Sequence, residues 1–133
     1  MKILCTRRLT FCAAHRLMGH EGGCANLHGH NYTVEVTATG DLDPVGRVVD
    51  FAEIKQGIGG WIDANWDHGF IHRQDDPLAT LVGGKVFALA GNPTAENMAE
   101  FLLNWVAPLV LPGVTVTRVR VWETETSYAE VTK

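Results

Sequence analysis

Hydrophobic and polar residues alternate along both ends of the chain. The segment 31–40, NYTVEVTATG, places an apolar or small residue at every second position, which is the pattern of a half-buried strand. Residues 2–14 are rich in β-forming residues, and the segment 114–131 alternates again. We therefore expect two antiparallel strands early in the chain and one or two strands at its end.

Between these strands the apolar spacing changes to that of two amphipathic helices. We expect Asp50 to cap the first helix, with Glu53 completing a capping box, and the helix to end near Trp66. Thr94 should cap the second helix and Pro108 should end it. The predicted apolar stripes are Phe51, Ile54, Ile58, Trp61 and Ile62 in the first helix, and Met98, Phe101, Leu102, Trp105 and Val106 in the second.

The order of these elements predicts an α+β fold. A chain of 133 residues with 46% hydrophobic content is long enough for one domain with a real core, and we expect a single domain over residues 1–133. The expected architecture is a four-stranded antiparallel sheet with both helices on one face. The other face of the sheet would then be uncovered, which favours its burial in an oligomer.

Charge and cysteine content exclude several classes of protein. The net charge is −4 and the pI is about 5.8, and the basic residues are scattered, so a nucleic-acid-binding face is not expected. Three cysteines without a signal region do not indicate a secreted disulfide framework, and we expect a reduced, cytoplasmic protein. No apolar run approaches the roughly 20 residues that a membrane span needs.

The stretch CANLHGHNY, residues 24–32, holds the best metal ligands of the chain. His28 and His30 are separated by one residue, so on a strand both side chains point to the same side. A third imidazole could come from His15, at the end of the first predicted strand. Three imidazoles leave one tetrahedral position open, as in a catalytic zinc site. A surface pair of histidines without a metal is an equally simple interpretation of the spacing.

Cys24, four residues before His28, allows two interpretations. It could be the fourth ligand of a closed structural zinc site, or a thiolate held beside an open one. Cys5 and Cys12 fit the strand pattern as small core residues, and we assign them no role.

Three acidic residues could also take part in chemistry. Asp67 directly precedes His68 at the expected end of the first helix, and the pair could serve proton transfer or merely end the helix. Glu96 lies in the first turn of the second helix, where the helix dipole favours it without any function. Glu123 shares a strand face with apolar residues, which makes it the more suggestive carboxylate. His20 and His72 carry no pattern and are expected to be exposed, and the four tryptophans are expected in the core.

Six short motifs together resemble one family. The motifs AAHRL, CANLHGHNY, VVDFAEIK, WDHGF, NPTAEN and ETETS occur in the order and approximate spacing of the 6-pyruvoyl tetrahydropterin synthase and 6-carboxytetrahydropterin synthase family. The match is specific because six motifs agree at once. The resemblance implies the tunnelling fold, in which subunits join their sheets into barrel-like trimers and two trimers form a hexamer.

The resemblance also implies a role for each matched residue. The zinc ligands would be His15, His28 and His30, and Cys24 the catalytic cysteine, which favours the open site. Asp67 and His68 would partner the cysteine from a neighbouring subunit. Glu123 would anchor the pterin, with Thr94 and Glu96 lining the same pocket, because a carboxylate can accept two hydrogen bonds from the pterin's adjacent N–H groups.

The implied substrate is 7,8-dihydroneopterin triphosphate. Three residues separate Cys24 from His28, the shorter spacing of the bacterial branch that makes 6-carboxy-5,6,7,8-tetrahydropterin for queuosine synthesis. The alternative is the 6-pyruvoyl tetrahydropterin branch, and a rival from another class is a non-catalytic zinc module. The connection 69–91 is longer than in the simplest bacterial members of the family.

Overall fold

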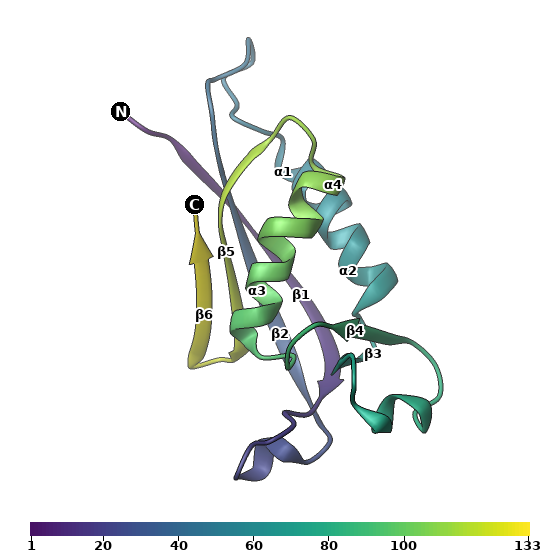
Figure 1. Cartoon of the computed structure of the whole chain (residues 1–133). Coiled ribbons are helices and arrows are strands. Elements are labelled where there is room, and N and C mark those ends of the chain that lie inside the picture. Colours follow the sequence, from purple (N-terminus) through teal and green to yellow (C-terminus); the bar gives the residue numbers. More distant parts are fainter.

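The alternating segments form the four long strands of the molecule. The computed structural model describes residues 1–133, and these strands are β1 (Leu4–His15), β2 (His28–Thr39), β5 (Thr115–Thr124) and β6 (Ser127–Thr132). They are antiparallel neighbours in the order β1, β2, β5, β6 (Figure 1). The predicted strands at both ends of the chain are therefore confirmed.

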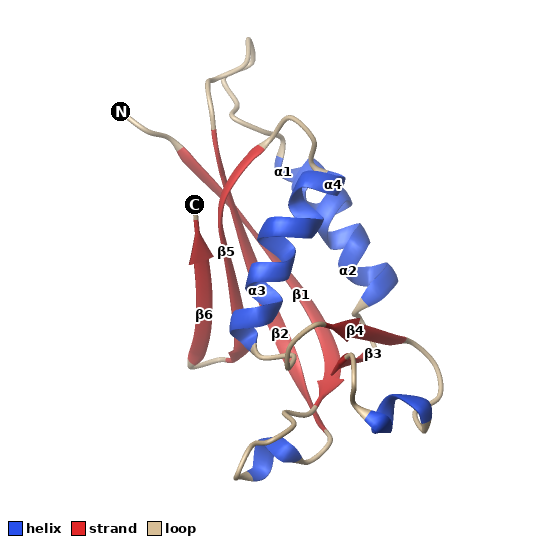
Figure 2. Ribbon diagram, viewed as in Figure 1, coloured by secondary structure: helices blue, strands red, loops and turns tan.

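The sheet is larger than expected, and the prediction of four antiparallel strands was wrong. Two short strands, β3 (Gly69–Arg73) and β4 (Val86–Leu89), extend it to six in the order β4-β3-β1-β2-β5-β6. They run parallel to β1 and to each other, so the curled sheet is mixed (Figure 2). Four of the five residues of β3 are buried, and such a short buried run lacks the alternation that would reveal a strand.

Two helical segments lie across one face of the sheet, as predicted (Figures 1 and 2). Asp50 caps the first segment by accepting a hydrogen bond from the Ala52 amide, and Thr94 caps the second through the Asn97 amide. The first segment comprises α1 (Phe51–Ile54), a π-helical turn (Lys55–Gly59) and α2 (Gly60–Asn65). The second comprises α3 (Ala95–Phe101), a π-helical turn (Leu102–Val106) and α4 (Ala107–Val110).

Pro108 does not end the second helical segment, contrary to the prediction. It lies in the first turn of α4, directly after the π-helical turn, and the helical segment continues through it. In that wider turn the Ala107 amide donates to the Leu102 carbonyl, so the regular hydrogen-bond ladder that a proline would interrupt is already altered ahead of it. Near the end of this segment, the first helical segment approaches closely at Gly57. A Cβ there would lie 2.9 Å from Leu111 Cδ2 and 3.0 Å from the Val110 carbonyl, so a side chain would force the two segments apart.

The core lies between the helices and the covered face of the sheet. Ile54, Ile58 and Ile62 of the first segment and Met98 of the second are fully buried against the inward residues of β1, β2 and β5. The expectation of four core tryptophans was wrong in part, because Trp105 is 70% exposed whereas Trp66 is buried. The remaining buried aliphatic residues of the covered face include Leu9, Val34, Val36, Val119 and Val121.

The opposite face of the sheet carries charged and polar side chains. Arg8 donates to Glu35 at 2.9 Å across β1 and β2, and Arg120 donates to Glu130 at 2.8 Å across β5 and β6. Such cross-strand ion pairs stabilise a sheet face that no helix covers, without apolar packing. A single chain does not test the expected barrel-like trimer, which stays a prediction. None of the helices combines the length and apolarity needed to cross a membrane.

Candidate functional site

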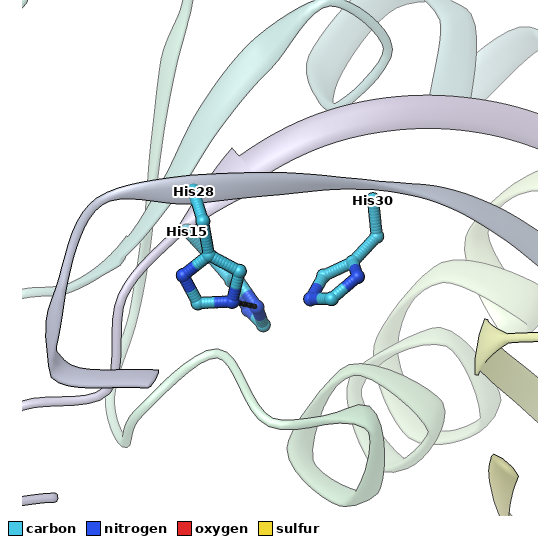
Figure 3. Close-up of side chains that lie close together, drawn as sticks. All are labelled: His15, His28 and His30. Atoms are coloured by element: carbon cyan, nitrogen blue, oxygen red, sulfur yellow. Dashed lines mark hydrogen bonds between the residues drawn. The ribbon is translucent and has the colours of Figure 1, made fainter. Parts of the chain in front are cut away.

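The register of β1 and β2 gathers the three predicted histidines. His15 lies opposite His28, and Ala13 lies opposite His30, so the three imidazoles stand on the same covered face at the end of the core. Their ring centroids are 4.6 to 4.9 Å apart, and one ligand nitrogen from each lies within 4.8 Å of the others. Figure 3 shows the three rings turned toward a common point.

Backbone carbonyls fix the orientation of two of these rings. His15 Nδ1 lies 2.8 Å from the Pro93 carbonyl oxygen, and His28 Nδ1 lies 2.6 Å from the Asn26 carbonyl oxygen. A carbonyl only accepts, so each Nδ1 carries the hydrogen and each neutral ring presents a bare Nε2 lone pair. The two Nε2 atoms are nevertheless 3.1 Å apart. Two lone pairs at that distance repel each other unless a cation lies between them.

The third imidazole, His30, also indicates a site for a cation. His30 Nε2 is buried and has no hydrogen-bond partner. Burial lowers the pKa of His15 and of His30, more than the nearby Glu123 carboxylate raises it, so both rings favour the neutral form that binds metals. Imidazoles held by carbonyls at the other ring nitrogen are typical of metal sites. The three residues therefore fit a divalent metal ion such as zinc.

Glu123 lies at the histidine cluster itself. It is on the same face of β5 as the buried Val119 and Val121, as the alternation indicated. Its Oε1 lies 3.2 Å from His15 Nε2 and 3.5 Å from His30 Nε2. The carboxylate is partly exposed, so a ligand can reach it from solvent while its oxygen faces the cluster.

Asp67 and His68 form a second cluster, together with a cysteine that the sequence did not indicate. His68 Nδ1 lies 2.9 Å from Asp67 Oδ2, and the Cys12 amide donates to Asp67 Oδ1 at 3.1 Å. One ligand atom each from Cys12, Asp67 and His68 lies within 4.8 Å of the others. Partial burial would raise the pKa of Asp67, but hydrogen bonds from Cys12 and His68 outweigh it and lower the pKa. Asp67 is thus an ionised partner for its imidazole neighbour.

The backbone conformation of His68 leaves its side chain exposed to solvent. His68 has a φ of 60°, in the left-handed region, which is uncommon for a residue other than glycine. The conformation is held by the His68 amide, which donates to the Cys12 carbonyl at 2.7 Å. The His68 side chain is 77% exposed. A strained residue with an exposed imidazole is a common arrangement at functional sites.

Cys24 belongs to neither cluster. It lies in a 3-10 turn (Gly23–Ala25) and is half-buried, and the turn is tied to the chain after β1 by the Leu17 amide, which donates to the Cys24 carbonyl. The closed site, with Cys24 as a fourth ligand, is therefore not assembled in this structure. Within one chain, Cys24 is also absent from the group around Asp67 and His68.

The NPTAEN segment contributes differently from expectation. Thr94 uses its hydroxyl to accept from the Asn97 amide at 3.1 Å, and Glu96 is exposed in the first turn of α3. The contact with the histidine cluster comes instead from the Pro93 carbonyl. Asn92 holds that carbonyl in place by exchanging two hydrogen bonds with the backbone of Met18. Sequence reasoning missed these backbone supports because a carbonyl leaves no residue-type signal.

His72 was expected to be exposed and is buried, which corrects that prediction. It lies in β3, and its Nδ1 is 2.8 Å from the Arg73 carbonyl oxygen. His20 is exposed, as predicted. A hollow of about 410 Å³ lies at the second cluster. It is lined by Cys12 and His68 of that cluster and by the strand residues Ala13, Ala14, Gly29, His30, Asn31 and Gly69.

Comparison with known proteins relates the whole chain to one group of enzymes. The family model of 6-pyruvoyl tetrahydropterin synthase matches residues 4–133. A protein of Rickettsia typhi named 6-carboxy-5,6,7,8-tetrahydropterin synthase is 41% identical, over 97% of this chain and 99% of its own length. A protein of the same name from Haemophilus influenzae is 35% identical, over 94% and 95%.

Solved structures agree on the fold. An uncharacterized protein from Wolinella succinogenes superposes with a TM-score of 0.82 at 25% identity, covering 100% of this chain and 99% of the other. The 6-pyruvoyl tetrahydropterin synthase of Caenorhabditis elegans gives a TM-score of 0.75 at 24% identity, covering 100% and 96%.

Proposed function

The chain belongs to the 6-pyruvoyl tetrahydropterin synthase family, and we propose that it acts as a zinc-dependent 6-carboxy-5,6,7,8-tetrahydropterin synthase. Its substrates would be 7,8-dihydroneopterin triphosphate and one water molecule, and its products 6-carboxytetrahydropterin, acetaldehyde and triphosphate. The observation that carries the proposal is the cluster of three imidazoles with converging ring nitrogens, among them the buried Nε2 of His30, which has no hydrogen-bond partner. The relatives named 6-carboxy-5,6,7,8-tetrahydropterin synthase support the choice of branch, as does the short spacing from Cys24 to His28.

The histidine cluster would hold the metal. His15, His28 and His30 supply three nitrogens and leave a fourth position for the substrate. When bound there, zinc would act as a Lewis acid toward the hydroxyls of the substrate side chain and lower their pKa. The carbonyls of Pro93 and Asn26 keep two of the rings in the required tautomer.

The second cluster would move protons. Asp67 is ionised and holds His68 Nδ1, which leaves His68 Nε2 free to exchange a proton with the thiol of Cys24 or with the substrate side chain. Cys24 lies apart from this pair in one chain, so we propose that the pair acts on the cysteine of a neighbouring subunit. The exposure of His68 and the open, polar face of the sheet support that arrangement.

We propose that the assembly is a hexamer formed by two barrel-like trimers, each chain contributing its single domain. Glu123 would accept the pterin's amino and ring N–H groups, and Thr94 and Glu96 would line the same pocket. A carboxylate provides two acceptors side by side, which matches that paired donor.

Product analysis tests the proposed function. The zinc-loaded protein is incubated with 7,8-dihydroneopterin triphosphate, and pterins, acetaldehyde and triphosphate are identified by mass spectrometry. We expect 6-carboxytetrahydropterin and acetaldehyde in equal amounts. Formation of 6-pyruvoyl tetrahydropterin without acetaldehyde would instead assign the chain to the other branch. Absence of any turnover by the zinc-loaded hexamer would favour a non-catalytic zinc module.

A further inference from the structure

The position of Glu123 indicates a second use for its carboxylate. Four ligands at about 2.0 to 2.1 Å from a tetrahedral zinc ion lie roughly 3.3 Å from one another. Three separations at the cluster are close to that value. His15 Nε2 is 3.1 Å from His28 Nε2 and 3.2 Å from Glu123 Oε1, and His30 Nε2 is 3.5 Å from the same oxygen. The carboxylate oxygen thus lies at ligand spacing from two of the three imidazoles, His15 and His30, and would have to move toward His28 to complete the tetrahedron.

Charge gives an independent reason for a cation at this point. The His15 ring carries its hydrogen on Nδ1, so the short contact between its Nε2 and Glu123 Oε1 sets a lone pair against a carboxylate oxygen. No lysine or arginine forms an ion pair with Glu123. The carboxylate therefore lacks a compensating positive charge unless a metal ion supplies it.

We propose that Glu123 Oε1 is the fourth ligand of the metal in the substrate-free protein, and that pterin binding draws the carboxylate away. Before substrate binds, the site is closed by three imidazoles and one carboxylate. The pterin's two N–H groups then compete for Glu123, which opens the fourth position only when the substrate is in place. The second step rests on the proposed function, whereas the first does not.

Cobalt binding tests the first step without any turnover. Metal-free protein is titrated with Co²⁺ in competition with a chromophoric chelator, and the visible absorption of bound Co²⁺ reports its ligands. The variant Glu123→Gln keeps the size of the side chain and removes its charge. We expect the variant to bind Co²⁺ about 10- to 100-fold more weakly and to shift the visible bands, with an unchanged thermal unfolding curve for the metal-free protein.

Glu125→Gln is the matched control, because Glu125 is an exposed carboxylate two residues further along the chain. It should bind Co²⁺ with the affinity and spectrum of the parent. A Glu123→Gln protein that is indistinguishable from the parent in both affinity and spectrum would overturn the inference, while leaving the proposed function intact. If His28→Ala also bound Co²⁺ like the parent, the histidine site itself would be wrong and the proposed function would fall.

Addition of a pterin tests the second step. Unsubstituted pterin is added to the Co²⁺-loaded parent and to Co²⁺-loaded Glu123→Gln. We expect the visible bands of the parent to move toward those of the variant, and the spectrum of the variant to change little. A parent spectrum that stays constant while fluorescence shows the pterin to be bound would overturn the displacement of Glu123.

Discussion

The two side-chain clusters differ in how the fold supports them. His15 and His28 of the first cluster are paired across two long strands on the helix-covered face, and backbone carbonyls fix their rings. The second cluster stands where a helix ends, and the exposed His68 side chain relies on a left-handed backbone and one carboxylate. The contrast is consistent with the proposal that the metal is bound within one chain and that proton transfer needs a neighbouring chain.

Removing one imidazole should have the largest effect. His28→Ala deletes one of the three imidazole ligands, and we expect at least about a 100-fold loss of zinc affinity, since even disturbing the support of a ligand costs 10- to 100-fold. Turnover should fall with the zinc content. Elemental analysis of the purified protein measures the effect, and His20→Ala, an exposed histidine outside both clusters, provides the control.

Cys24→Ala should separate the two clusters, because it removes a thiol that lies outside the histidine group. We expect it to keep zinc near one ion per chain and to lose turnover. A Cys24→Ala protein that lost its zinc would instead indicate a closed structural site.

Asp67→Asn tests the second cluster with a smaller expected effect. The amide keeps the hydrogen bond with the Cys12 amide but no longer stabilises a protonated His68, so kcat should fall about 100-fold with zinc content unchanged. Steady-state kinetics and elemental analysis decide the outcome. Asp63→Asn, on the exposed side of α2, should keep the parent kcat. An equal loss in both variants would argue against a specific role for Asp67.

The fourth test concerns the stability of the histidine end of β1. Arg16 follows His15 and donates through Nε to Asp76 Oδ2 at 2.8 Å, and the Asp76 side chain is fully buried. Asp76 also accepts from the Leu78 amide and so caps the 3-10 turn Pro77–Thr80. We expect Asp76→Asn to lower the free energy of unfolding by about 2 kcal/mol, because it leaves the Arg16 charge half-buried without its partner.

The pH dependence of this loss follows from the pKa of Asp76. The Arg16 guanidinium holds that pKa below its usual value. A carboxyl whose pKa is lowered on folding contributes stability above its unfolded pKa of about 4, and this contribution disappears as the pH falls through the lower folded pKa. Urea unfolding should therefore show the gap between parent and Asp76→Asn closing as the pH falls below about 4. Asp75→Asn, at an exposed pair, should change stability by less than about 1 kcal/mol at any pH.

The same contrast explains what the sequence could predict. The histidine cluster followed from strand alternation and from one residue between His28 and His30, because register on a regular strand fixes the direction of a side chain. The caps Asp50 and Thr94 were also predictable from local sequence, because a helix cap depends on the residue type directly before the first turn. The strands β3 and β4 were not, since β3 is buried on both faces and has no alternation, and β4 is only four residues long. Cys12 was overlooked because its proximity to Asp67 depends on the parallel pairing of β1 with β3.

The smallest effect, and the most direct test of the contrast, is expected from mixing inactive subunits. If Cys24 of one chain works with His68 of its neighbour, Cys24→Ala and His68→Ala proteins are each inactive, but a mixed oligomer contains some sites with both residues intact. Random assembly of equal amounts gives about one quarter of such sites, because each of the two contributing chains must be of the right kind. We expect activity to return to about that fraction of the parent after the two variants are unfolded together and refolded. Light scattering should show a hexamer before and after mixing. Recovery of no activity from correctly assembled mixed hexamers would mean that both residues act within one chain, and that the exposed second cluster must reach Cys24 by a movement of its own loop.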